Sequence, residues 1–223
     1  MKHRLHAIAF ACLLVALSPS LAQGPAPRVE TTTVEAHGEW LLLESGGLDL
    51  SGRTQEGRPA KLRMQQDEMQ KQCSRYRDRP PPEVAQALRE RARRDMNHPS
   101  GDIPLGDWRK GAELARSGFG FRIGAQYDDH AAREPGGNCY ACHALSPREL
   151  AYGSIGPSLT GYGTRLGDSQ AVRRFVYEMI HDPTLHQPCS AMPRFGRHGF
   201  LTREQITHLM AYLLDPQSPV NQP

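Results

Sequence analysis

Apolar residues recur at helical spacing in the second half of the chain. Six of them fall on one face of a helix in residues 169–181, and residues 202–214 carry a second apolar stripe. A third, shorter helix is predicted over residues 107–117, where a glycine follows the last apolar position. Since strand-like alternation does not occur between these segments, residues 101–223 are predicted to form an all-α domain.

Residues 23–100 are more polar and are predicted to form a separate, partly helical extension. Helices are expected over residues 60–77 and 83–96, and the proline run between them separates the two. Seven arginines lie between Arg75 and Arg94, which could form a docking surface. We favour a solvated helix face, because acidic residues are interspersed with them. Such weakly amphipathic helices are expected to lie against the domain or a partner chain.

The first 22 residues have the order of a secretory signal peptide. A basic start is followed by an apolar stretch over residues 7–17 and by small residues ending at Ala22. That stretch is too short to span a bilayer, and no other segment is apolar enough. We expect cleavage near Ala22 and export to the periplasm. The formal net charge of +3 falls to +1 without the leader, which excludes the strongly basic surface of a nucleic-acid binder.

The sequence Cys139-Tyr140-Ala141-Cys142-His143 is typical of covalent haem attachment. Two thiols at this spacing can add to the two vinyl groups of one porphyrin, and the adjacent histidine can ligate the iron. A Cys-x-x-Cys pair alone would also fit a redox dithiol or half of a zinc site. The trailing His143 and the predicted export favour one covalently bound haem c.

Two cysteines remain after the haem pair and the leader residue Cys12 are set aside. Cys73 and Cys189 would lie in an oxidising compartment, where free thiols seldom persist. We predict a Cys73–Cys189 disulfide. Unpaired or intermolecular use of these thiols stays open.

Met192 is the predicted second iron ligand opposite His143. It lies in a loop, before Pro193, where helix packing does not explain it, whereas Met179 and Met210 fall on apolar helix stripes. Methionine and histidine together suit an electron-transfer haem, because both axial positions are filled. The alternatives are the histidines that follow the motif in sequence: His181, His186, His198 and His208.

The segment Gly156-Pro157 is expected to pass over the proximal histidine. A backbone carbonyl there could accept a hydrogen bond from Nδ1 of His143 and fix its tautomer. An ordinary proline-containing turn is the alternative. The order helix, haem motif, loop, helix, terminal helix is that of a small all-α, class I cytochrome c.

Residues 107–223 resemble the SoxX subunit of the SoxXA cytochromes of bacterial thiosulfate oxidation. The most specific of the matching runs are Met192-Pro193-Arg194-Phe195-Gly196 and the C-terminal Leu213-Leu214-Asp215-Pro216-Gln217-Ser218-Pro219-Val220-Asn221. Haem binding does not explain the C-terminal run, which fits a subunit contact.

The resemblance implies a heterodimer with a SoxA-like cytochrome subunit. That complex is an L-cysteine S-thiosulfotransferase, which oxidatively joins thiosulfate to a cysteine of a SoxYZ-like carrier. In that family the reactive cysteine belongs to SoxA, so this chain would contribute no catalytic residue and would accept electrons. Cys139, Cys142, His143 and Met192 match the haem-binding positions. We infer that a soluble cytochrome c removes the electrons afterwards.

Two further hypotheses belong to other classes. A freestanding periplasmic electron carrier would need no catalytic partner, although the extension and the C-terminal run argue against it. A zinc or dithiol protein would carry no haem, and its absorption spectrum would lack a Soret band.

Overall fold

The computed structural model describes residues 33–54, 58–120 and 132–222. The chain divides into two units, Met1–Leu48 and Asp49–Pro223. In the first, helix α1 (Val34–Leu43) begins where the Thr33 hydroxyl accepts a hydrogen bond from the amide of Ala36. This helix is not among those expected from the sequence, and none of its residues is buried.

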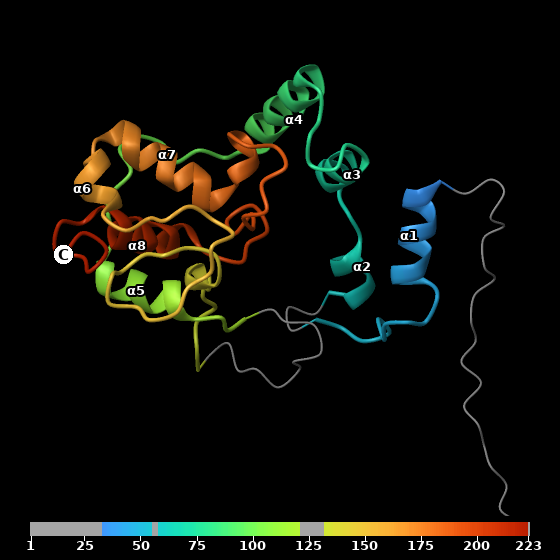
Figure 1. Cartoon of the computed structure of the whole chain (residues 1–223), viewed down its shortest axis with the longest axis horizontal. Helices are drawn as coiled ribbons and strands as arrows, with labels where there is room; N and C mark the ends of the chain where they lie inside the picture. Colours follow the sequence, from blue (N-terminus) through green and yellow to red (C-terminus); the bar gives the residue numbers. More distant parts are fainter. Residues whose placement is uncertain (1–32, 55–57, 121–131, 223) are drawn as a thin grey trace, which may run out of the picture. The chain divides into compact units, whose positions relative to one another are not determined.

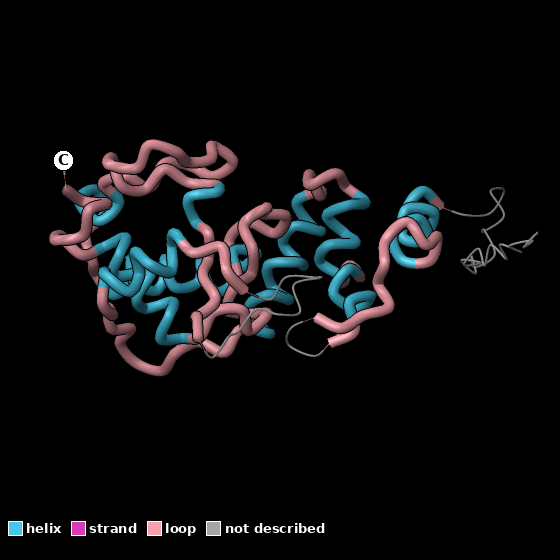
Figure 2. Tube along the Cα trace, turned by 90° about the horizontal axis from the view of Figure 1, so that it is seen from below, coloured by secondary structure: helices cyan, strands magenta, loops and turns pink. Residues whose placement is uncertain are grey.

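The second unit consists of helices joined by loops (Figures 1 and 2), and no strand occurs among its described residues. The described part of the chain holds no helix with the length and apolar character that crossing a membrane requires. The all-α fold predicted from the sequence is therefore observed. Its elements are α2 (Ala60–Met64), α3 (Glu68–Arg75), α4 (Pro82–Asp95), α5 (Trp108–Arg116), the 3₁₀ turn η1 (Cys139–Ala141), α6 (Tyr162–Leu166), α7 (Gln170–His181), the 3₁₀ turn η2 (Pro183–Leu185) and α8 (Arg203–Leu214).

Helix α8 forms the centre of the core. Met210 and Tyr212 are fully buried in it, and α5 lies alongside (Figure 1). The two helices approach backbone to backbone at Gly111, where a Cβ atom would lie 2.1 Å from the carbonyl oxygen of His208. Any larger residue at Gly111 would force α5 away from α8.

The single helix predicted over residues 60–77 is wrong, because the structure has two helices there. The chain is extended at Gln65, and Asp67 then begins α3 with a reciprocal capping box. The Asp67 carboxylate accepts from the amide of Gln70, whose side chain accepts from the amide of Asp67. This cap satisfies amides that a continuous helix would bond elsewhere, so a new helix starts.

Helices α3 and α4 belong to the same core as the helices that follow. Their buried residues join one apolar cluster with α5, α7 and α8, and α4 contacts the turn η2. The members from the earlier part of the chain are Met69, Cys73, Leu88, Ala92 and Met96. Helices α3 and α4 of the extension therefore pack on the C-terminal part of their own chain. The domain boundary placed at residue 100 stays a prediction.

The C-terminal run packs inside the same unit. Val220 is buried, and the Asn221 amide donates to the carbonyl oxygens of Leu213 at 3.0 Å and Asp215 at 2.9 Å. The Asn221 side-chain oxygen accepts from the amide of Thr164 in α6. The run thus satisfies carbonyl groups at the end of α8. The subunit contact expected from the sequence stays a prediction.

Candidate functional site

The Cys-x-x-Cys-His sequence forms one tight turn. Asn138 adopts a left-handed conformation (φ 46°), which asparagine tolerates better than most residues, and η1 begins directly after it. The amides of Cys142 and His143 both donate to the carbonyl oxygen of Cys139, at 3.1 and 2.9 Å. This turn gathers both thiols and the imidazole within five residues.

The end of α5 delivers the chain to this turn. The amide of Gly137 donates to the carbonyl oxygen of Leu114, and that of Asn138 donates to Ser117, both at 2.9 Å. A Cβ atom on Gly136 would lie 2.3 Å from the Ser117 side chain. The two glycines therefore let the segment lie directly on the helix end, which fixes where Cys139 emerges.

Tyr140 anchors the motif to α8. Its hydroxyl lies 2.7 Å from the hydroxyl of Tyr212 and accepts from the amide of Ser146 at 3.3 Å. Both tyrosines are buried, and burial raises the pKa of Tyr212, which keeps the Tyr212 hydroxyl neutral. No local sequence pattern predicts this contact, which joins residues 72 positions apart.

His143 is oriented by the loop that follows it. Its Nδ1 lies 2.7 Å from the carbonyl oxygen of Pro157. A carbonyl oxygen can only accept, so Nδ1 carries the proton and Nε2 keeps a lone pair for a metal. Gly156 contacts the ring closely, since a Cβ atom there would lie 2.2 Å from Cε1 of His143. The Gly156-Pro157 segment thus occupies the position expected from the sequence.

The thiols of the motif fit haem attachment better than the alternatives. Cys139 and Cys142 are not joined to each other. Burial raises the pKa of Cys139 to about 12, whereas a redox dithiol needs a thiol that ionises readily. Among the described residues, the two thiols and His143 do not converge as the ligands of one metal ion would. Two separate thiols beside an oriented imidazole suit a porphyrin edge with its iron.

The Met192 loop lies near the motif. Met192 is half-buried, and its amide donates to the hydroxyl of Ser190 at 3.2 Å. Phe195 belongs to the same loop. A Cβ atom added at Gly137 would lie 3.7 Å from Cζ of Phe195 and 3.2 Å from Sγ of Cys139. Phe195 of the Met192 loop and the Cys139 thiol therefore both lie close to Gly137.

Several of the alternative iron ligands are buried in a helix or have other hydrogen-bond or ion-pair partners. Met210 is fully buried inside α8. Both ring nitrogens of His208 have partners, the amide of Asp107 at 2.8 Å and the Glu204 carboxylate at 3.6 Å. His186 binds the Glu178 carboxylate at 2.8 Å. Met179, His181 and His198 stay as alternatives, and the assignment of Met192 stays a prediction.

The structure contains the Cys73–Cys189 disulfide, with the two Cα atoms 5.5 Å apart. It connects α3 to the loop that leads into Met192. Cys73, Cys189, Met192 and Arg194 line one groove of about 440 Å³. The disulfide therefore faces the same hollow as the predicted ligand.

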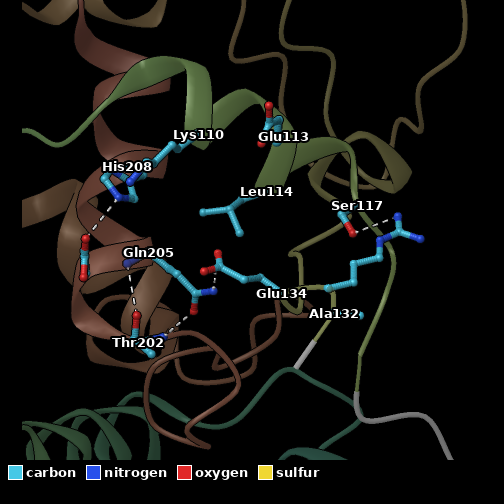
Figure 3. A pocket seen from close by; sticks show the side chains of 11 residues that line it. Lys110, Glu113, Leu114, Ser117, Ala132, Glu134, Thr202, Gln205 and His208 are labelled. Carbon is cyan, nitrogen blue, oxygen red and sulfur yellow. Dashed lines mark hydrogen bonds and ion pairs between the residues drawn. The ribbon is translucent and has the colours of Figure 1, made fainter. Parts of the chain in front are cut away.

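A larger pocket of about 630 Å³ lies between α5 and α8 (Figure 3). Gln205 points into it and donates to the Glu134 carboxylate at 3.3 Å, and charges of both signs surround the pair. None of the predicted haem-binding residues lines this pocket. It is therefore separate from the candidate haem site.

Sequence reasoning missed the ion pairs that reach the Met192 loop. Asp67 contacts Arg194 at 2.6 Å, and Asp95 contacts Arg197 at 2.8 Å. The Asp-x-x-Gln pattern at Asp67 could have revealed its capping role. Its ion-pair partner Arg194, however, lies more than a hundred positions away in the sequence. No local pattern carries that information.

Comparison with known proteins agrees with this geometry. The cytochrome c family matches residues 127–216. A protein of Aquifex aeolicus (strain VF5), described as an uncharacterized lipoprotein, is 42% identical over 158 residues, which cover 70% of this chain and 73% of that protein. The chain belongs to the same family as the Aquifex aeolicus protein, and its residues 127–216 form a cytochrome c domain, a type of domain that binds haem c covalently.

Proposed function

We propose that this chain is the SoxX-like, single-haem subunit of a SoxXA-type complex that conjugates thiosulfate to a SoxYZ-like carrier. The observation that carries the electron-transfer part is the hydrogen bond between His143 and Pro157 beside two free thiols. The SoxX-like part rests on the resemblance of the Met192 loop and the C-terminal run. A bound haem would supply one-electron transfer.

The residues of this chain have distinct tasks in that function. Cys139 and Cys142 would hold the haem through thioether bonds, and His143 and Met192 would ligate its iron. The carbonyl of Pro157 keeps the proton of His143 on Nδ1, which preserves the ligand nitrogen. With these two ligands the iron would offer no open site to substrate, so this chain would carry electrons and the sulfur chemistry would belong to the SoxA-like partner.

The electron count limits what this chain can do alone. Joining two sulfur atoms releases two electrons, whereas one haem accepts one. The second electron must therefore reside on the partner or leave in a separate step. A soluble cytochrome c is the proposed final acceptor for this chain.

A freestanding electron carrier is the second proposal. The structural observation that favours it is the intramolecular role of the C-terminal run, whose Asn221 side chain is used within the chain. This removes one argument for a subunit contact. The resemblance of the Met192 loop still favours the complex.

The deciding experiment is a pull-down of the natively exported protein, with mass spectrometry and a visible spectrum of the eluate. A covalent haem that co-purifies with a SoxA-like chain supports the complex, and thiosulfate conjugation becomes the assay. A haem protein that elutes alone favours the carrier. A protein without a Soret band contradicts both.

The mature N-terminus tests the proposed export. We propose a soluble periplasmic form that begins at Gln23. The Aquifex aeolicus relative is described as a lipoprotein, so lipid attachment is the alternative. Intact mass of the exported protein separates the two, because a lipid-modified Cys12 would contradict cleavage near Ala22.

A further inference from the structure

Three links connect the earlier part of the chain to the loop that carries Met192. The disulfide joins Cys73 to Cys189. The other two are the ion pairs Asp67–Arg194, at 2.6 Å, and Asp95–Arg197, at 2.8 Å. Each link joins one residue of the loop to one residue of the earlier segment. The loop residues lie between positions 189 and 197, and the residues that they contact lie in or next to α3 and α4.

Met192 lies between two of these links. Cys189 precedes it by three residues and Arg194 follows it by two. An extended chain reaches at most about 3.6 Å per residue, so the Met192 Cα can move no farther than roughly 11 Å from the first anchor and 7 Å from the second. The two anchors together restrict where the Met192 sulfur can be.

Most of the loop's own backbone hydrogen bonds lie to either side of Met192. The Ser190 amide donates to Gln187 before it, and the amides of Gly196 and Arg197 donate to His181 after it. The Met192 amide itself donates to the hydroxyl of Ser190. The links to α3 and α4 therefore add to the constraints on the part of the loop that carries Met192.

The links are shielded from solvent to different degrees. The Arg194 side chain is 9% exposed, and Cys73 is buried in the apolar cluster. The Arg197 side chain is 28% exposed, and it also contacts the buried carboxylate of Asp182 at 3.4 Å. The disulfide and the Asp67–Arg194 pair should therefore constrain the loop more strongly than the Asp95–Arg197 pair.

We propose that Asp67, Cys73 and Asp95 are positioning residues that would hold Met192 in place as an iron ligand, so that residues 67–95 control the sixth coordination site. This inference rests on the proposed ligation by Met192. Residues 67–95 are then part of the haem site, and loss of their links to the loop opens the iron to external ligands.

The test uses the exported holo-protein and three variants. These are the double variant Cys73→Ala/Cys189→Ala, Asp67→Asn and Asp95→Asn. The control is Asp168→Asn, which breaks the ion pair of Asp168 with Arg173 away from this loop. The readouts are the sulfur-to-iron charge-transfer band of the ferric protein, the rate of carbon monoxide binding to the ferrous protein, and the reduction potential.

We expect the double cysteine variant to lose most of the charge-transfer band and to bind carbon monoxide readily. Asp67→Asn should raise the rate of carbon monoxide binding roughly tenfold, Asp95→Asn less, and Asp168→Asn should leave it unchanged. The reduction potential should fall where Met192 is released, because methionine ligation raises it.

The proposal is overturned if the double variant is folded, holds its haem and keeps the band of the wild type. Should that variant not be recovered, reduction of the assembled wild-type disulfide by a dithiol tests the same link, with the same expected and contradicting spectra. The variant Met192→Ala distinguishes failure of the proposed iron ligation from failure of the proposed positioning role. A band that survives in Met192→Ala overturns the ligation itself, whereas a band lost there and retained in the cysteine and Asp67 variants overturns only the positioning role.

Discussion

The carbonyl oxygen of Pro157 lies 2.7 Å from Nδ1 of His143, and Gly156 touches the same ring from the backbone side. One loop therefore fixes both the tautomer and the orientation of the His143 ring. The bond comes from the backbone, so no side-chain substitution removes it directly. The adjacent glycine is the position through which it can be disturbed.

Gly156→Ala should displace the His143 ring. The new Cβ atom would lie 2.2 Å from Cε1 and 2.5 Å from Nδ1, so the ring or the loop must shift. We expect a loss of about 1–3 kcal/mol in the free energy of unfolding of the holo-protein and a changed visible spectrum. Denaturant titration followed in the visible range measures both. Ser154→Ala, at an exposed site of the same loop, is the control, and equal behaviour of the two variants would contradict the role of Gly156.

Tyr212→Phe should destabilise the protein, because the buried hydroxyl of Tyr140 loses one of its two hydrogen-bond partners, the Tyr212 hydroxyl at 2.7 Å, and keeps only the Ser146 amide. The expected loss is about 1–3 kcal/mol in the free energy of unfolding. Tyr177→Phe is a matched control. Tyr177 is equally buried, but its hydroxyl has no hydrogen-bond partner among the described residues, so its removal should be neutral or stabilising. Urea unfolding of both variants checks this, and the opposite ranking would contradict it.

Asn221→Ala should weaken the attachment of the C-terminal run to α8. The substitution removes two donated bonds, to Leu213 and Asp215, and one accepted from Thr164. We expect a loss of about 2–3 kcal/mol, since carbonyl groups at the helix end lose their partners. Gln222→Ala, at an exposed neighbouring position, should cost much less. Thermal unfolding measures the difference, and equal melting temperatures of the two variants would contradict the stabilising role of the Asn221 bonds.

The helices of the C-terminal half were predictable because their signals are local. The stripe and capping residues at 202–214 and 169–181 predict α8 and α7 to within a residue of their observed bounds. The single helix predicted over residues 60–77 is wrong, because the capping box at Asp67 interrupts an otherwise continuous helical pattern. Local signals therefore predict where helices are more reliably than where they break.

The contacts that build the candidate site were less predictable. The disulfide followed from counting cysteines, and the position of Pro157 followed from its place after the motif. The Tyr140–Tyr212 pair and the Asp67–Arg194 pair could not be found this way, because each joins residues far apart with no repeating pattern. Only the packing of α3 and α8 against the motif and its loops brings these side chains together.

His181 should make the stability of the protein depend on pH. Burial lowers its pKa, and although Asp182 opposes this, Arg203, Arg197 and His98 act in the same direction as burial. Its Nδ1 is buried without a hydrogen-bond partner among the described residues. In the unfolded chain a histidine has a pKa of about 6.5. Between that pH and the lower pKa of the folded state, the unfolded chain binds more protons, so the free energy of unfolding falls as the pH is lowered from 7 to 5.

His181→Phe should remove part of that slope while keeping an aromatic ring beside Tyr177, whose centroid lies 5.7 Å from that of His181. The variant should match or exceed the wild type at pH 7 and gain on it progressively toward pH 5. Some slope should persist, because burial also lowers the pKa of His198. Urea unfolding at several pH values measures this. Parallel curves for the two proteins would show that His181 is protonated equally in the folded and unfolded states, and would remove it as a source of acid sensitivity.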